Sequence, residues 1–276
     1  MEEDKTDNPP RPAAVRLAFR VSYLGSRFYG SQMQAQSRTV EGEFIAACQR
    51  LSLFSDWRQA GFQSAGRTDR GVHARGQVIA FSTDAPDRAT ATINLQLPPD
   101  LWCSAYAPVP AEFHPRYDAR SRTYRYYFSE IPNYVDGMQK ACLHFLGPHD
   151  FSNFARVKDK NPRRNILGTR IAEEDGFLYF EVTAESFLWH QVRCMAAALL
   201  QVGSGEIGAD SIRQYLQGEI ERPISPAPAE GLVLWDTDCG LSWDPLPDRE
   251  RSSIFMDHLR RHHALMEKVC RVLRER

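Results

Sequence analysis

The sequence of 276 residues lacks several features that define common classes of protein. It has no apolar run long enough to cross a bilayer, and the acidic, then proline-rich residues 1–13 lack the basic and apolar regions of a secretion signal. We therefore expect a disordered tail over residues 1–13 and a cytoplasmic protein. No glycine-rich phosphate-binding fingerprint follows a predicted strand, which argues against the common nucleotide-binding motifs.

Cysteine is scarce and dispersed. The six cysteines form no CxxC pair, and most have apolar neighbours, which argues against a structural zinc site or a disulfide framework. His258 and His262 have a helical spacing that suits a metal, but no third ligand beyond Asp257 accompanies them. We predict no metal site, and a solvated basic helix at this position.

An excess of positive charge is also absent, since the net charge is -1. The basic residues are nevertheless clustered in three segments, at 116–125, 156–164 and 249–276. In the first of these, arginines alternate with tyrosines. Cations contact phosphates and aromatic rings stack on bases, so these segments are candidates for RNA contact. Solvated surface is the alternative for each of them.

The most informative segment separates two apolar stretches and reads Ala65-Gly66-Arg67-Thr68-Asp69-Arg70-Gly71-Val72-His73-Ala74. Its two glycines allow sharp turns on either side of the acid. We expect Arg67 and Arg70 to hold Asp69 ionised, because nearby positive charge favours a carboxylate. An ionised carboxylate at a strand-to-loop transition can serve as a nucleophile or a general base. The alternative is a surface turn with a weak ion pair.

Apolar periodicity predicts a mixed α/β protein with two units, 14–110 and 111–248. Strands are expected at 17–23, 77–83, 102–109, 123–129, 166–172, 177–184 and 232–235. Helices are expected at 40–51, 89–97, 135–145, 188–202 and 211–217, the first with Thr39 as its N-cap.

The segment 249–276 has the pattern of a basic amphipathic helix. Its apolar face contains Phe255, Leu259, Met266, Cys270 and Leu273. We expect this face to pack on the core, with a dimer contact or an RNA contact as alternatives.

Five segments in order carry a family resemblance that covers about residues 15 to 238. They are Tyr23-x-Gly25-x-x-Phe28-x-Gly30-x-Gln32 with 38–42, Gly66–Ala74 with 76–81, 113–126, Phe187-Leu188-x-His190-Gln191-Val192-Arg193, and 228–234. Together they resemble the TruA family of tRNA pseudouridine synthases. The resemblance implies an α/β pseudouridine synthase fold, in which two ferredoxin-like or RRM-like subdomains with mixed antiparallel sheets flank a central RNA-binding cleft.

The resemblance also implies a reaction and roles for individual residues. A uridine in the anticodon stem-loop of tRNA would become pseudouridine through a catalytic aspartate, and Asp69 is the position that matches. Arg67 would replace the flipped base in the stack, Tyr124 would stack on the target base, and Arg193 would pair with Asp69. Residues expected to contact RNA are Arg70, His73, Arg116, Arg122, Arg163 and Arg164. A homodimer that binds tRNA across both subunits, with no cofactor and no membrane, is implied as well.

Arg193 is supported independently, because an arginine on an apolar helix is costly without a carboxylate partner. Two positions depart from the usual family pattern. Ser31 stands where bacterial members usually have tryptophan, which looks more like archaeal members, and Cys194 stands where asparagine is frequent. His73 and His190 lie near the motifs, and no Ser or Cys nucleophile accompanies either of them.

Two other functions compete with an isomerase. One is a non-catalytic tRNA-binding or RNA-folding protein on the same scaffold. The other is a carboxylate-based hydrolase such as a glycosidase, which needs two acids that face one bond. No second acid accompanies Asp69 in its motif.

Overall fold

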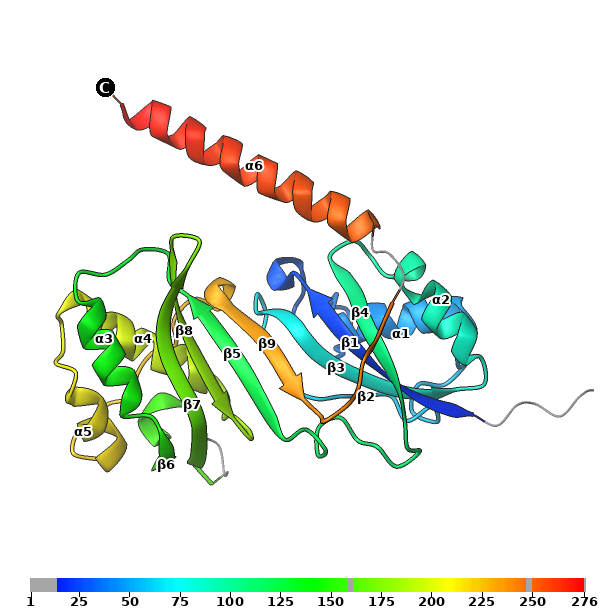
Figure 1. The fold of residues 1–276 in the computed structure, drawn as a ribbon, viewed down its shortest axis with the longest axis horizontal. Helices are drawn as coiled ribbons and strands as arrows, with labels where there is room; N and C mark the ends of the chain where they lie inside the picture. The colour runs from blue at the N-terminus through cyan, green and yellow to red at the C-terminus, as the bar shows by residue number, and fades with distance from the viewer. Residues whose placement is uncertain (1–13, 158–160, 247–249, 276) are drawn as a thin grey trace, which may run out of the picture.

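The computed structural model describes residues 14–157, 161–246 and 250–275, and its centre is a ten-stranded sheet (Figure 1). The strand order is β10-β4-β1-β3-β9-β5-β8-β7-β6, with β2 paired to β3. The strands are β1 (Val15–Tyr23), β2 (Gln63–Ser64), β3 (His73–Thr83), β4 (Leu101–Val109), β5 (Ser121–Tyr127), β6 (Gly147–Asp150), β7 (Arg163–Glu174), β8 (Phe177–Ala184), β9 (Leu232–Asp238) and β10 (Asp244–Pro245). The helices are α1 (Val40–Arg50), α2 (Pro86–Gln96), α3 (Val135–Leu143), α4 (Gln191–Ser204), α5 (Ser211–Gln217) and α6 (Glu250–Arg274). The expected mixed α/β class is confirmed, whereas the tail expected at 1–13 lies outside the described residues.

In the first half of the chain, α1 and α2 cover one face of the sheet. Leu17, Phe19 and Val21 alternate along β1 and join the main apolar core, because successive side chains of a strand face opposite sides. Thr39 caps α1 as expected, since its hydroxyl accepts a hydrogen bond from the backbone N–H of Gly42 at 3.2 Å. The sheet in this half is therefore fixed from one side by helices.

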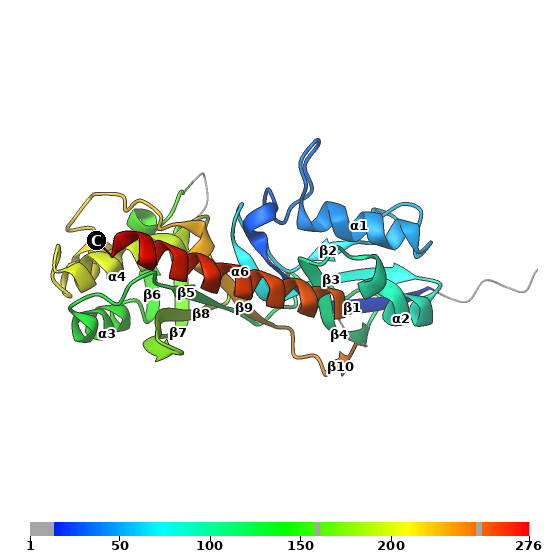
Figure 2. The ribbon, with the colours of Figure 1, turned by 90° about the horizontal axis from the view of Figure 1, so that it is seen from above.

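In the second half, α3 and α4 pack together over β5, β8 and β7. Met138 and Ala141 of α3 are fully buried, as are Met195, Ala198 and Leu199 of α4. One apolar cluster includes these residues together with the core of the first half. Figure 2 shows α1 and α4 on the same side of the sheet. The two halves thus share one core and one sheet.

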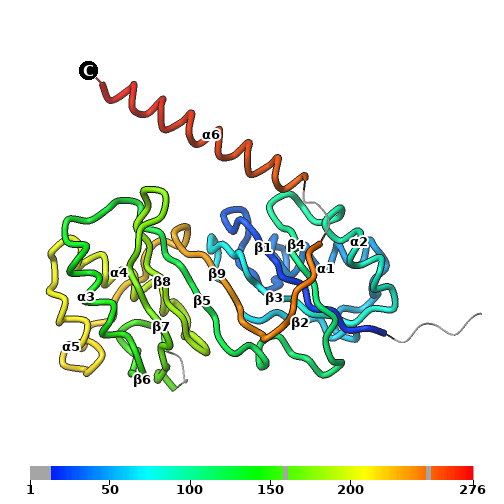
Figure 3. The backbone as a smooth tube through the Cα atoms, in the orientation of Figure 1, coloured from blue at the N-terminus to red at the C-terminus, as the bar shows by residue number. Residues whose placement is uncertain are grey.

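The halves meet where β3 and β9 pair in parallel, with His73 opposite Val233 and Ala74 opposite Leu234. The chain also crosses between the halves after β4 and after β9, and the two crossings run close together along one edge (Figure 3). A hydrogen bond of 2.7 Å from the Arg120 N–H to the Asp238 carbonyl joins them. Because the Asp69 loop directly precedes β3, this junction places the loop between the halves.

Helix α6 extends away from the rest of the molecule (Figure 1). Of its residues, Ser252 is the one that is buried, and Ile254, Leu265 and Leu273 are at least 60% exposed. The helix was expected from the sequence, but the expected packing of its apolar face on the core is wrong for this chain. The amphipathic pattern specifies an apolar face without specifying what covers it.

Most element boundaries agree with the sequence to within a few residues, and two kinds of difference have local causes. Helix α4 begins at Gln191 and not at residue 188, because His190 before it has a left-handed backbone with φ of 65°. Strands β2, β6 and β10 were not predicted, since each has only two to four residues. Among the described residues, no helix is both long and apolar enough to cross a membrane.

Candidate active site

The loop between β2 and β3 presents Asp69, and its neighbour Thr68 fixes the loop to the first block of the sequence. The Thr68 hydroxyl lies 2.7 Å from the Tyr23 hydroxyl in a buried hydrogen bond. The Thr68 N–H donates to Ser31 Oγ at 2.8 Å, and the Ser31 N–H donates back to the Thr68 carbonyl at 3.0 Å. Ser31, the residue that departs from the bacterial pattern, therefore holds the backbone beside Asp69.

Glycines let this loop approach the 25–31 segment closely. A Cβ atom on Gly25 would lie 1.9 Å from the Val72 carbonyl oxygen, so only glycine fits there. Gly71 has a φ of +85°, as a sharp turn after Asp69 requires, whereas Gly66 has open space around it and no positive φ. Of the two glycines in the motif, only Gly71 adopts the kind of backbone conformation for which the sequence suggested a glycine.

Three side chains from one short segment surround the Asp69 carboxylate. Trp189 Nε1 donates to Oδ1 at 3.0 Å, Arg193 Nη1 donates to Oδ2 at 3.5 Å, and His190 Nε2 lies 3.3 Å from Oδ2. The structure thus places Arg193 beside Asp69, as expected. Trp189 and His190 were not expected as partners, because their spacing to Asp69 in the sequence gives no sign of contact.

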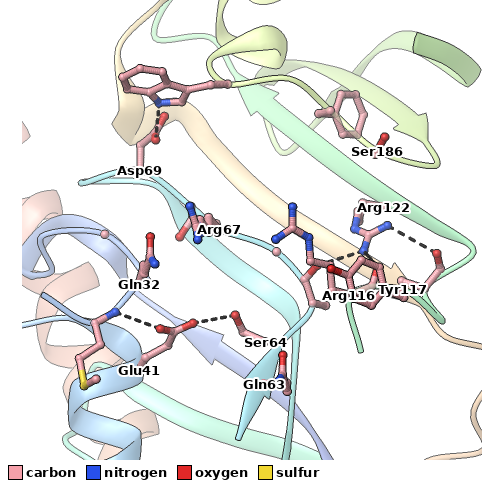
Figure 4. A pocket seen from close by; sticks show the side chains of 18 of the residues that line it. Gln32, Glu41, Gln63, Ser64, Arg67, Asp69, Arg116, Tyr117, Arg122 and Ser186 are labelled. Carbon is pink, nitrogen blue, oxygen red and sulfur yellow. Dashed lines mark hydrogen bonds between the residues drawn. The ribbon is translucent and has the colours of Figure 1, made fainter. Parts of the chain in front are cut away.

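The two arginines of the motif do not pair with Asp69, which corrects the expectation from the sequence. Arg70 turns away and its guanidinium lies 4.4 Å from the centre of the Tyr29 ring. Arg67 is exposed and faces the same space as Asp69 (Figure 4). Within the described residues, the side chains that lie at ion-pair distance from Asp69 are those of Arg193 and His190. The arginines that neighbour Asp69 in the sequence are therefore not the ones that neighbour it in space.

Arg193 is anchored as well as charged. Its Nε donates to the Ala227 carbonyl at 2.7 Å, and its side chain is only 15% exposed. This bond fixes one edge of the guanidinium and directs Nη1 toward Asp69. A partly buried arginine held in this way supplies a fixed positive charge, with less competition from water than a surface ion pair has.

Tyr124 lies on β5 and lines the same space as Asp69. Its ring meets Phe187 edge to face, with centroids 5.3 Å apart. Burial raises the pKa of Tyr124 to about 12, and the nearby Asp69 carboxylate adds to the rise while Arg122 opposes it. The phenol is therefore protonated at neutral pH and is available as a hydrogen-bond donor.

Asp69, Arg67 and Tyr124 line a cavity of about 1140 Å³ that both halves of the chain form. Further arginines on its wall are Arg70, Arg116, Arg120 and Arg122. The Asp69 side chain is 33% exposed, so it is accessible from this cavity. The cavity therefore combines an accessible carboxylate with a concentration of positive charge, although the whole chain has a net charge of -1.

The remaining residues expected to contact RNA have different surroundings. Arg122 lines the cavity, but it donates to the carbonyls of Ala65, Arg116 and Glu185 at 2.5–3.0 Å, which ties the Asp69 loop to the second half. His73 Nδ1 accepts from the Gly25 N–H at 3.0 Å, and burial lowers its pKa. These bonds give both side chains a structural role.

Arg163 and Arg164 lie at the start of β7 and do not line the cavity. Arg164 Nη1 donates to the backbone carbonyls of Asn161 and Arg163. Within the described ranges, no group of three His, Cys, Asp or Glu side chains could hold a metal ion, and this includes the His258 and His262 pair.

Comparison with known proteins shows the family to which the chain belongs. A family model described as tRNA pseudouridine synthase matches residues 141–238, which include Arg193 but not Asp69. A protein named tRNA pseudouridine synthase A from Methanoculleus marisnigri is 54% identical over 255 residues, covering 92% of this chain and 94% of the relative. Relatives of the same name from Methanosphaerula palustris (51% over 259 residues, 94% and 92%) and Thermococcus sibiricus (40% over 223 residues, 80% and 84%) are also similar. The chain therefore belongs to the TruA family of tRNA pseudouridine synthases.

Proposed function

We propose that this tRNA pseudouridine synthase uses Asp69 as its catalytic carboxylate, on uridines in the anticodon stem-loop of tRNA. The observation that carries the proposal is an accessible carboxylate in a cationic cavity, paired with a partly buried arginine. The reaction breaks the bond from the ribose to N1 of the base and forms a bond to C5. The hydrogen on C5 leaves as a proton and N1 gains a proton, so the product is an isomer of the substrate. No other reactant is needed, and no cofactor enters the proposal.

The target base must leave the stack before the carboxylate reaches its glycosidic bond, which costs a few kcal/mol. Arg67 is suited to compensate for this cost, since it is exposed and faces the cavity. Tyr124 and Phe187 provide aromatic surface for the extruded base, and base stacking contributes about 1–3 kcal/mol. The arginines of the cavity wall would contact the phosphates on either side.

The proposal includes a homodimer acting in the cytoplasm, as the family resemblance implies. The cavity of one chain is large enough for an extruded nucleotide, whereas a whole tRNA is far larger than the cavity. A second subunit would supply the additional surface. Sedimentation of the full chain, alone and with unmodified tRNA, measures the number of subunits in each state.

The first prediction concerns Asp69→Asn. We expect this variant to bind unmodified tRNA but to form pseudouridine at least about 1,000-fold more slowly, because the amide cannot act as a nucleophile or a base. Pseudouridine is mapped after incubation of the tRNA with wild type and variant. Asp175→Asn is the matched control, since Asp175 is exposed in the β7–β8 turn and asparagine tolerates its φ of 53°.

The same experiment separates the alternatives. Binding by the wild type without any pseudouridine would favour a tRNA-binding protein. Release of free uracil would favour a hydrolase. Normal turnover in Asp69→Asn would exclude Asp69 as the catalytic acid.

A further inference from the structure

The carboxylate of Asp69 is held more tightly than an Asp69–Arg193 pair alone would explain. Oδ1 accepts from Trp189, and Oδ2 has two neighbours, Arg193 Nη1 at 3.5 Å and His190 Nε2 at 3.3 Å. We propose that His190 is a positioning residue, whose imidazole, with Nε2 3.3 Å from Oδ2, restricts the orientation of the Asp69 carboxylate that acts on the substrate. This inference rests on the proposed catalytic role of Asp69.

The backbone of His190 supports this role. Its φ of 65° and ψ of 0° are left-handed, which is uncommon for any residue other than glycine. The residue stands at the N-terminus of α4, yet its side chain makes no capping hydrogen bond that would account for the conformation. Such outliers are concentrated at functional sites, where the surrounding structure keeps them in place. Here the conformation places the imidazole against Asp69.

The surroundings of the ring specify which nitrogen carries the hydrogen. The side chain is 11% exposed, and Nδ1 is buried without a hydrogen-bond partner among the described residues. A buried N–H without an acceptor is disfavoured, so the single hydrogen of the neutral ring belongs on Nε2, which faces Asp69. The tautomer that the burial favours has its N–H on the side of the ring that faces the carboxylate.

The charge of the ring follows from its neighbours. Burial lowers the pKa of His190; Asp69 raises it, while Arg193 of α4 and Arg156 of the loop after β6 lower it further. The shift is downward from the ordinary histidine value, so the imidazole is neutral at pH 7. A neutral imidazole beside the carboxylate restricts its orientation without adding a second full positive charge, which would make Asp69 a weaker nucleophile or base.

His190 and Arg193 therefore differ in what they contribute. Arg193 supplies a permanent charge and is anchored by the Ala227 carbonyl, whereas His190 places a neutral ring close to Oδ2 that can become charged. Protonation of His190 at low pH would strengthen its hold on Oδ2 and withdraw electron density from the carboxylate. Turnover should consequently fall as the pH decreases through the His190 pKa, which lies below about 6.5.

Two substitutions of His190 test the proposal, and both must adopt the same left-handed backbone conformation. His190→Leu removes the donor, and His190→Gln retains an N–H that reaches about as far as Nε2. Neither residue is β-branched, so the left-handed conformation costs both variants a similar amount of stability. Single-turnover rates at saturating tRNA, the tRNA Kd, and the pH dependence of the rate are measured for both variants and the wild type. Circular dichroism confirms that each variant is folded.

We expect His190→Leu to lower the single-turnover rate by about 10- to 100-fold with little change in the tRNA Kd, since small displacements of a reacting group have effects of this size. His190→Gln should recover much of the rate, and the decrease at acid pH that depends on His190 should be absent from both variants. If His190→Leu does not fold, His190→Gln tests the same point. An active His190→Gln variant should then lack the fall in single-turnover rate at acid pH that the wild type shows.

The proposal is overturned if Asp69→Asn is inactive while His190→Leu retains the wild-type rate and pH profile. It is also overturned if the loss in His190→Leu is confined to the tRNA Kd. A fully active Asp69→Asn variant would instead overturn the proposed function, and the role of His190 with it. The two failures are therefore distinguishable.

Discussion

At the scale of single residues, the active-site loop depends on close backbone contact more than on charge. Gly25 approaches the Val72 carbonyl so closely that no side chain fits. Ser31 and Tyr23 then fix Thr68, immediately before Asp69. The position of Asp69 is thus set by residues more than 35 positions away in the sequence, as the separation of 37 between Ser31 and Thr68 shows.

A prediction at this scale concerns Gly25→Ala. A methyl group there would overlap the Val72 carbonyl, so the loop must move, and we expect a loss of about 1–3 kcal/mol in the free energy of unfolding together with a lower turnover. Denaturant unfolding and the rate of pseudouridine formation measure the two effects. Gly208→Ala is the control, because nothing lies within 4 Å of its added methyl and it is outside the cavity. Equal behaviour of the two variants would contradict this account of the loop.

The sequence predicted some of these residues and could not predict others. Asp69, Tyr124 and Arg193 were identified through the family resemblance, and the structure brings all three to one cavity or its edge. The pairing of Asp69 with Arg67 and Arg70 was wrong, because neighbouring side chains in a loop diverge. Trp189 was not foreseen, since a tryptophan in an apolar segment is usually read as a core residue.

At the scale of secondary structure, the elements with a clear apolar period were predicted well. The helices α1, α3 and α5 and the β7–β8 hairpin have patterns that few other structures satisfy. The pairing of β3 with β9 was not predicted, because periodicity shows which face of a strand is buried but not which strand lies beside it. The exposure of α6 was missed for the same reason.

A prediction at this scale concerns removal of α6. A chain that ends at Leu246 should keep its Tm to within about 2–4 °C, because the helix buries little besides Ser252 and its base is linked to Leu95 by one hydrogen bond from Arg251. Differential scanning calorimetry of the truncated and full chains measures this difference. A second truncation after Arg260 serves as a control for the base of the helix. A decrease of about 10 °C in the shorter chain would show that α6 packs on the body in solution.

At the scale of the whole molecule, the distribution of charge matters more than its total. The net charge is -1, yet arginines from both halves converge on the cavity that contains Asp69. The sequence indicated basic clusters but could not show that the first of them faces Asp69 while Arg163 and Arg164 do not. Folding of the chain creates a local positive field that the composition does not reveal.

A prediction at this scale concerns the salt dependence of tRNA binding. Arg116→Ala should weaken binding and reduce the slope of log Kd against log salt by about 1, because one phosphate contact is lost. Binding is measured by fluorescence anisotropy at several salt concentrations. Arg213→Ala is the control, since Arg213 is exposed on α5 and does not line the cavity. Equal changes in slope for the two variants would contradict a phosphate contact specific to the cavity.

The position of β9 has a consequence for the synthesis of the protein. This strand lies in the middle of the sheet, but it is made after nearly all the other strands. On the ribosome, β3 and β5 therefore lack β9, the strand that lies between them, until residue 238 has emerged. Unpaired strand edges are prone to association with other chains, so the nascent protein passes through a vulnerable interval that ends only when this late strand is inserted.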